Sequence, residues 1–298
     1  MTYRAGVTAS RYFGGVIVRR WHGVALAGLA VFALACEAGA GGAGGGDPEP
    51  TGAPPKGYPS SMAALGDSIT AGFGSCGAFL VCGRNSWATG TADAVDSHYR
   101  RILAKNPRIK GKARNFARPG ARASDLATQA AQAIDMKAQY VTILIGANDA
   151  CAGSTAAMTS VATFRSRIDR GLNRLKKGLP KASVMVAGIP DVYRLWQQGR
   201  KDDRAVRAWQ RFGTCPSMLA DPTSTDETDD QRRRDVRARI NDYNDELAEA
   251  CAKYGSRCRW DDDPHEAGFS LDLVNQVDYF HPDAEGQAEL ADLTYGFK

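Results

Sequence analysis

From residue 62 onwards, short apolar runs alternate with segments of helical periodicity, and this alternation is the strongest constraint on the fold. The apolar runs predict strands at 62–65, 140–145 and 182–189, and residues 112–117, basic at their start and apolar at their end, predict a further short strand. The periodic segments predict helices at 91–105, 124–137, 155–178, 230–254 and 282–295. Because strands that alternate with helices form parallel sheets covered on both faces, we expect an α/β fold. Its predicted architecture is a three-layer α/β/α sandwich with a mainly parallel central sheet.

The first 35 residues predict an export signal. Four arginines and no acidic residue precede Glu37, and an apolar run occupies residues 24–35. That run is shorter than the ~20 residues of a membrane-spanning helix, and Ala33-Leu34-Ala35 forms a small-residue cleavage site. The paired arginines at 19 and 20 are a feature of twin-arginine export, although the ordinary secretory route is our expectation.

Cleavage after Ala35 leaves Cys36 first, as in bacterial lipoproteins, whose acylated cysteine anchors them to the outer face of the cell membrane. Ala33 stands where such signals usually carry a larger aliphatic residue. Simple secretion, with cleavage at Ala35 or beyond Ala40, is therefore the alternative to membrane anchoring. Residues 36–60 are rich in Gly and then Pro and predict a flexible tether, which leaves 61–298 as the folded domain.

The charge balance argues against nucleic acid as a partner. The chain of 298 residues has a net charge of +5, and setting aside the leader's four arginines leaves 34 basic against 33 acidic residues. Nucleic-acid-binding domains are usually strongly basic, so we expect this chain to bind no nucleic acid. We also expect the protein to be a monomer. The run Arg232-Arg233-Arg234 predicts a solvated helix face.

Cysteine usage predicts disulfides. Six cysteines follow Cys36, an even number in a chain predicted to be exported. Their spacing favours Cys76–Cys82 and Cys251–Cys258 as local loops, which leaves Cys151–Cys215 as a long-range bridge. No Cys-x-x-Cys pair supports zinc, and the acidic residues at 261–266 lack a calcium-loop motif. We expect no metal and no cofactor.

Three of the predicted strands end in polar turns that contain glycine. The turns are Gly66-Asp67-Ser68, Arg118-Pro119-Gly120 and Gly146-Ala147-Asn148-Asp149. Parallel sheets carry their sites at the carboxyl ends of the strands, so Ser68 is a candidate nucleophile. The N–H groups of Ser68 and Gly120 and the Asn148 amide are candidate oxyanion donors. We interpret Asp67 and Asp149 as residues that hold their turns.

Among the four histidines, His281 is the best candidate for a general base. His22 lies in the leader, His98 is predicted on a solvated helix face, and His265 is predicted in an exposed loop. Asp278 precedes His281 by three residues, so its carboxylate can fold back onto the imidazole and fix the tautomer.

The four blocks around Ser68, Gly120, Asn148 and His281 resemble the SGNH (GDSL) hydrolase family, which is named for these residue types. The resemblance runs over residues 62–293 and implies a flavodoxin-like sandwich. With six cysteines and a predicted export signal, the chain is similar to secreted actinobacterial lipases and esterases. This resemblance implies three disulfides.

The resemblance also implies the chemistry. Ser68 would attack an ester carbonyl, His281 would take its proton, Asp278 would orient His281, and Ser68, Gly120 and Asn148 would form the oxyanion hole. The implied substrate is a small-molecule or lipid acyl ester. One alternative keeps the mechanism and makes the enzyme a deacetylase of acylated envelope carbohydrate. The other is a catalytically silent, surface-binding lipoprotein.

Overall fold

A computed structural model describes residues 56 to 297 of the chain. The predicted signal, Cys36 and the tether up to residue 55 lie outside the described residues. Residues 58 to 60, which the sequence assigned to the tether, are held against the domain because Asn106 Nδ2 donates to the backbone oxygens of Tyr58 and Pro59, at 3.3 and 3.0 Å. In the part of the chain that is described, no helix is both long and apolar enough to cross a membrane.

One sheet of five parallel strands forms the centre of the domain, in the order β2-β1-β3-β4-β5. The strands are β1 Met62–Gly66, β2 Ala113–Asn115, β3 Tyr140–Leu144, β4 Ser183–Ala187 and β5 Cys258–Asp261. Every residue of β1 and β3 is buried, as expected for central strands that helices cover on both faces. This order is the flavodoxin-like one, and the predicted α/β class and sandwich are confirmed.

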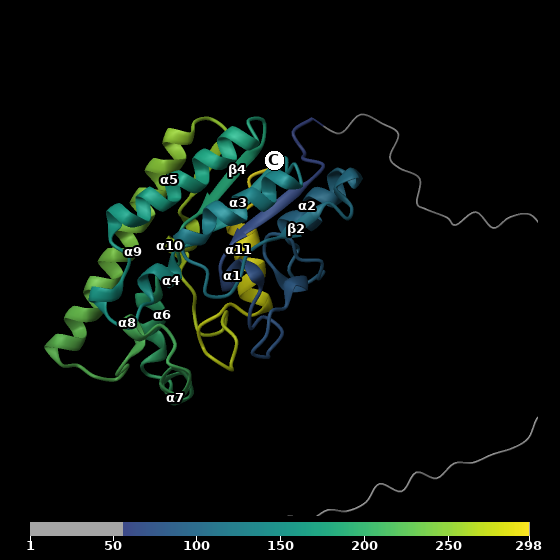
Figure 1. Ribbon diagram of the computed structural model, residues 1–298. Helices are drawn as coiled ribbons and strands as arrows, with labels where there is room; N and C mark the ends of the chain where they lie inside the picture. Colours follow the sequence, from purple (N-terminus) through teal and green to yellow (C-terminus); the bar gives the residue numbers. More distant parts are fainter. Residues whose placement is uncertain (1–55, 298) are drawn as a thin grey trace, which may run out of the picture. The chain divides into compact units, whose positions relative to one another are not determined.

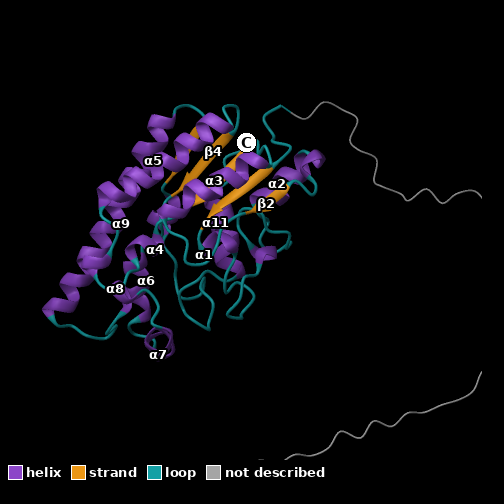
Figure 2. Cartoon of the chain, in the orientation of Figure 1, coloured by secondary structure: helices purple, strands orange, loops and turns teal. Residues whose placement is uncertain are grey.

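Helices flank the sheet on both faces (Figures 1 and 2). They are α1 Ser68–Ala71, α2 His98–Lys105, α3 Leu126–Asp135, α4 Ala147–Ala150, α5 Val161–Gly178, α6 Val192–Gly199, α7 Asp203–Phe212, α8 Pro216–Leu219, α9 Glu227–Tyr254, α10 Asp263–Ala267 and α11 Ala284–Thr294. Helices α3, α5 and α9 pack side by side as one layer. Helices α2 and α11 are joined by hydrogen bonds from His98 and Arg101 to Thr294 and Asp292.

Several boundaries differ from the predicted ones. Strand β5 and helices α6 to α8 were not predicted, because Cys258-Arg259-Trp260-Asp261 has no apolar run and residues 190–230 mix aromatic and charged residues. The predicted helix at 91–105 begins only at His98, where Ser97 caps it by accepting from Arg100 N–H. Residues 271–277 form a loop with one isolated bridge from Val274 to Pro282.

His98 and Arg233 correct two predictions of exposure. His98 is fully buried, with its ring nitrogens 3.0 Å from Tyr140 Oη and 2.9 Å from Thr294 Oγ1. Arg233 is also fully buried, because its guanidinium lies over the Trp196 ring and pairs with Asp230 at 2.8 Å. His98 is buried by partners 42 and 196 residues away, whereas Arg233 continues the buried stripe of α9 that includes Val236 and Ile240.

Residues 56–297 contain three disulfides: Cys76–Cys82, Cys151–Cys215 and Cys251–Cys258. The first and third close short loops, and the second spans 64 residues. Cys151–Cys215 joins the turn after α4 to the start of α8. This bridge therefore fixes one border of the carboxyl edge of the sheet, where the loops gather (Figure 2).

Candidate active site

Ser68 follows β1 directly because Gly66 allows the chain to turn there. Gly66 has φ +150°, and a Cβ at this position would lie 2.2 Å from Leu144 O, so only glycine fits. The buried side chain of Gln129 holds the same residue, accepting from Gly66 N–H at 2.7 Å and donating to Gly66 O at 2.9 Å. The turn that presents Ser68 is thus clamped on both backbone groups.

Asp67 caps the short helix α1. Its Oδ1 accepts from the N–H of Ile69 at 3.0 Å, while its Oδ2 has no hydrogen-bond partner among the described residues. The carboxyl group is fully buried, and this burial raises the pKa of Asp67 to about 7. Asp67 holds the turn, as predicted, and it is also a buried titratable group beside Ser68.

Ser68, His281 and Asp278 form one hydrogen-bonded series. His281 Nε2 lies 2.9 Å from Ser68 Oγ, and His281 Nδ1 lies 2.7 Å from Asp278 Oδ2. When Nδ1 donates to the carboxylate, Nε2 is left to accept from the serine hydroxyl. Burial alone raises the pKa of Asp278, but the hydrogen bond and charge of His281 outweigh it and hold that pKa below its usual value.

The loop that carries His281 is organised by Asn275. Asn275 Nδ2 donates to Asp278 Oδ1 at 2.8 Å and to His281 O at 3.0 Å, and its Oδ1 accepts from the N–H of Asp278. Tyr279, inside this turn, has φ +53°, a left-handed conformation that surrounding contacts must hold. One such contact is Trp209 Nε1 of α7, which donates to Tyr279 O at 3.0 Å.

Gly120 and Asn148 lie after the two strands that flank β1. Gly120 follows β2 and Asn148 follows β3, so Ser68 is between them at the carboxyl edge. Within the described chain, the N–H groups of Ser68 and Gly120 donate to no protein acceptor. Asn148 Nδ2 donates to Ala121 O at 3.0 Å, and its second hydrogen is available. These three groups remain the candidate oxyanion donors at this edge of the sheet.

Asp149 ties the loops of Gly120 and Asn148 together. Its buried carboxylate accepts from Ala123 N–H and from Thr159 Oγ1, both at 2.8 Å. Burial is the main reason that the pKa of Asp149 is raised. The sequence-based interpretation of Asp149 as a structural residue agrees with these contacts.

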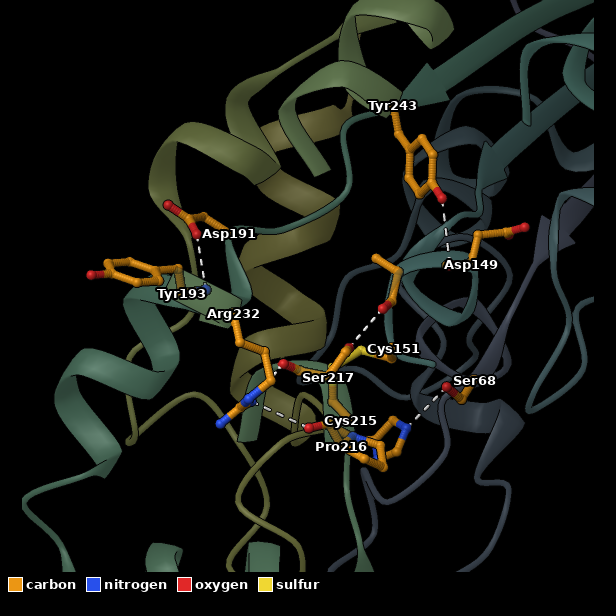
Figure 3. Close-up of a disulfide and its surroundings, with 12 residues drawn as sticks. Ser68, Asp149, Cys151, Asp191, Tyr193, Cys215, Pro216, Ser217, Arg232 and Tyr243 are labelled. Carbon is orange, nitrogen blue, oxygen red and sulfur yellow. Dashed lines mark hydrogen bonds between the residues drawn. A yellow bond between two sulfur atoms is a disulfide. The ribbon is translucent and has the colours of Figure 1, made fainter. Parts of the chain in front are cut away.

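Figure 3 shows how the Cys151–Cys215 disulfide braces the same region. Ser217 Oγ donates to the backbone oxygen of Ala150 at 2.7 Å, which joins α8 to α4. From α9, Arg232 donates to the oxygen of Ser217 at 2.6 Å. The end of α4 is therefore held by a disulfide and by a hydrogen bond from α8, and α8 is held in turn by Arg232 of α9.

A small apolar cavity borders the site. Ile69, Ala147 and Phe280 line it, and each is the chain neighbour of Ser68, Asn148 or His281. The rest of the lining is Pro190, Val192, Leu195, Phe269 and the buried Asp191. A larger cavity at the opposite end of the sheet is lined by Tyr58, Tyr140 and Phe297 and contains none of the candidate site residues. In the described part of the chain, no group of His, Cys, Asp and Glu side chains is placed to hold a metal ion.

A serine, a histidine and a carboxylate in this order, with unpaired N–H donors beside the serine, define the serine-hydrolase class of site. The chain belongs to the GDSL-like lipase/acylhydrolase family, whose model matches residues 62–294. It is a carboxylic ester hydrolase, as the sequence predicted.

Solved structures with a similar chain course include an extracellular lipase from Streptomyces rimosus, with 17% identity, TM-score 0.43 and coverage of 79% of this chain and 99% of that one. Phospholipase A1 from Streptomyces albidoflavus has 19% identity and TM-score 0.45, with coverage of 79% of this chain and 99% of that one. A family two carbohydrate esterase from Clostridium thermocellum has 15% identity and TM-score 0.48, with coverage of 81% and 64%. Comparison with curated proteins finds no match.

The sequence did not reveal the residues that support the site. Gln129 and Trp209 bond to atoms of the site from other segments, and Asn275 bonds to them from within the His281 loop. A fourth, Gln287 of α11, donates to Ile69 O at 2.8 Å. Only Asn275 carried a local signal, because Asn-x-x-Asp is a spacing at which an asparagine can cap a turn.

Proposed function

We propose that this chain is an exported serine ester hydrolase that works through an acyl-enzyme intermediate. Ser68 is the nucleophile, His281 the general base and Asp278 the residue that orients it. The observation that carries the proposal is the unbroken series from Ser68 Oγ to His281 at 2.9 Å and from His281 to Asp278 at 2.7 Å. These separations suit proton transfer without rearrangement.

In the first half-reaction, Ser68 Oγ attacks the ester carbonyl carbon while His281 Nε2 takes the hydroxyl proton. Asp278 stabilises the imidazolium that forms. The negative charge moves to the carbonyl oxygen, where the N–H groups of Ser68 and Gly120 and the Asn148 amide donate to it. Collapse of this intermediate breaks the ester C–O bond, and His281 gives its proton to the leaving alcohol.

In the second half-reaction, water replaces the alcohol. His281 removes a proton from the water, the hydroxide attacks the acyl carbon, and the same donors stabilise the second tetrahedral intermediate. Its collapse returns the proton to Ser68 and releases the carboxylic acid. No metal or cofactor takes part in this scheme.

The proposed substrate is an acyl ester, either a small molecule or a lipid. The support for an acyl group is the match to the GDSL-like lipase/acylhydrolase family over residues 62–294. A series of p-nitrophenyl esters from acetate to palmitate tests this, and faster release of acetate from acetylated polysaccharide would assign the carbohydrate substrate instead.

We propose that the domain works outside the cell as a monomer, after removal of residues 1–35. Three disulfides support an oxidising compartment, and the basic and apolar leader supports export. Residues 36–60 would link Cys36, acylated or free, to the domain. Palmitate labelling of the wild type and of Cys36→Ala distinguishes a membrane-anchored lipoprotein from a secreted enzyme.

Replacement of Ser68 tests the proposed function. Purified Ser68→Ala should hydrolyse p-nitrophenyl butyrate at least about 10⁴-fold more slowly than the wild type. A fluorophosphonate probe should label the wild type and not the variant. Unchanged turnover in Ser68→Ala would refute the assignment, and an unlabelled wild type with an intact fold would favour a silent binding protein.

A further inference from the structure

Four exposed side chains form an apolar patch beside the candidate active site. They are Phe79, Leu80, Val81 and Phe212, with exposed fractions of 58%, 50%, 50% and 41%. Among the residues that the structure describes, no other large hydrophobic side chain is this exposed. Apolar side chains gathered in one place, unlike scattered ones, indicate a binding surface.

Aromatic contacts connect this apolar patch to the base. The ring of Phe79 stacks on that of Phe212 with centroids 5.2 Å apart, and it meets Phe73 edge-on at 4.9 Å. Phe73 in turn packs against the imidazole of His281, also at 4.9 Å. Apolar surface therefore extends without a break from solvent to the residue that activates Ser68.

Both segments that carry the patch are held in place. The Cys76–Cys82 disulfide closes the loop of Phe79, and Gly74 N–H donates to Leu80 O at 2.9 Å across it. Helix α7 ends at Phe212 and is fixed to the His281 loop by the bond from Trp209 to Tyr279. These restraints hold the apolar side chains toward solvent, although burying them would lower the free energy.

Positive charge borders the patch. The guanidinium of Arg211 lies 5.7 Å from the centre of the Phe212 ring. Arg207 is one helical turn earlier and so shares that side of α7. Both arginines are exposed, and neither pairs with a carboxylate in the described part of the chain. Exposed aromatic and aliphatic side chains next to basic ones suit the boundary between acyl chains and anionic headgroups.

We propose that the apolar patch docks on an anionic phospholipid surface and thereby brings ester bonds of that surface to Ser68. The hydrolytic half of this inference rests on the proposed function, whereas the docking half does not. A second copy of the chain is the competing occupant, but unpaired arginines on both copies would repel each other across a two-fold contact.

The experiment measures docking without hydrolysis. Ser68→Ala protein is sedimented with vesicles of phosphatidylglycerol or of phosphatidylcholine. We expect binding to the anionic vesicles, and we expect the added pair Phe79→Ser and Phe212→Ser to weaken it at least about tenfold, because two buried aromatic side chains are lost from the lipid. Adding Arg211→Gln to the Ser68→Ala protein should weaken vesicle binding about fivefold. The matched substitution Arg234→Gln on α9 should not weaken it.

Several outcomes would overturn the proposal. If the variant with Phe79→Ser and Phe212→Ser bound vesicles as well as Ser68→Ala alone, the patch would not be the docking surface. The same would follow if Arg234→Gln weakened binding as much as Arg211→Gln. Concentration-dependent dimerisation that the same pair abolishes assigns the patch to a second copy instead. In protein that keeps Ser68, the double variant Phe79→Ser and Phe212→Ser should hydrolyse soluble p-nitrophenyl acetate at the wild-type rate. Failure of that assay in the wild type itself concerns the proposed function and leaves the docking result standing.

Discussion

The proposed nucleophile, Ser68, and the proposed base, His281, are held in different ways. Around Ser68 the partners come from distant parts of the chain: Gln129 lies 63 residues from Gly66, and Gln287 lies 218 residues from Ile69. Around His281 the partners are local, since Asn275 and Asp278 are within six residues of it. Both regions are buried, but the bonds of the first join distant segments, whereas those of the second mostly close within one loop, with Trp209 as a distant partner.

This difference predicts different consequences of mutation. A change near Ser68 disturbs contacts between the sheet and two helices, so it should lower the free energy of unfolding. A change in the His281 loop alters hydrogen bonds that mostly close within the loop, so it should lower turnover while most of the stability remains. Each prediction below tests one side of that contrast.

The largest effect is expected for Asp278→Asn. The new side chain keeps the acceptor that Asn275 and the backbone use, but its amide can face Nδ1 and favour the wrong tautomer of His281. We expect kcat to fall by on the order of 10³- to 10⁴-fold with little change in the melting temperature. Asp272→Asn is the matched control because Asp272 is an exposed carboxylate of the same loop. A large loss of stability in Asp278→Asn would contradict the loop's independence.

The next effect tests the core side. In Gly66→Ala the new Cβ would meet Leu144 O at 2.2 Å, which no side-chain movement can relieve. We expect the free energy of unfolding to fall by about 3 kcal/mol, measured by urea denaturation. Gly111→Ala is the control, since Gly111 has φ +73° and open space at its Cβ. It should cost only about 1 kcal/mol for the left-handed backbone. Similar losses in both variants would show that the contact with Leu144 O is not what matters.

The sequence predicted the residues that do chemistry better than those that support them. Ser68, Gly120 and Asn148 follow apolar runs, and His281 has an acid three residues before it, so each lies in a local pattern. Gln129 lies inside a helical repeat and looks like any solvated glutamine. Its two bonds to Gly66 depend on how α3 packs on β1, and a local pattern does not encode that packing.

The same limit explains the fold errors. Strand β5 was missed because its residues are only partly buried at the edge of the sheet, so hydrophobic selection on it is weak. His98 was placed on a solvated face because arginines follow it. Its burial depends on Tyr140 and Thr294, which lie 42 and 196 residues away. The strands predicted at β1 and β3 are present in the structure. Both are buried on two faces, and such strands need the continuous apolar runs that the sequence shows.

A matched pair of supporting residues sharpens the comparison. Asn275→Ala removes the bonds to Asp278 and His281, so we expect kcat to fall about 30-fold with KM little changed, equivalent to about 2 kcal/mol. Gln129→Ala leaves the backbone groups of Gly66 without their buried partner, so we expect a loss of about 2 kcal/mol in unfolding free energy. Steady-state kinetics and urea denaturation on both variants check this. Exchanged phenotypes, with Asn275→Ala unstable and Gln129→Ala slow, would reverse the contrast.

The smallest effect concerns two buried titratable groups, one at each end of the sheet. Burial raises the pKa of Asp67 to about 7 and lowers the pKa of His98 to about 3. Between pH 6.5 and pH 4, folded Asp67 holds a proton that the unfolded chain has lost, so acid stabilises the fold through Asp67. Over the same range unfolded His98 gains a proton that the folded chain refuses, so acid destabilises the fold through His98.

Each group changes stability by about 1.4 kcal/mol per pH unit, with opposite signs, so their sum is nearly flat between pH 6 and pH 5. Asp67→Asn should therefore lose about 1.4 kcal/mol from pH 6 to pH 5 relative to the wild type, and His98→Gln should gain about as much. Urea denaturation at the two pH values measures both slopes. If the unfolding free energy of both variants changed in the same direction between pH 6 and pH 5, other groups would dominate. Changes in opposite directions would show that the two ends of the sheet respond to acid in opposite ways.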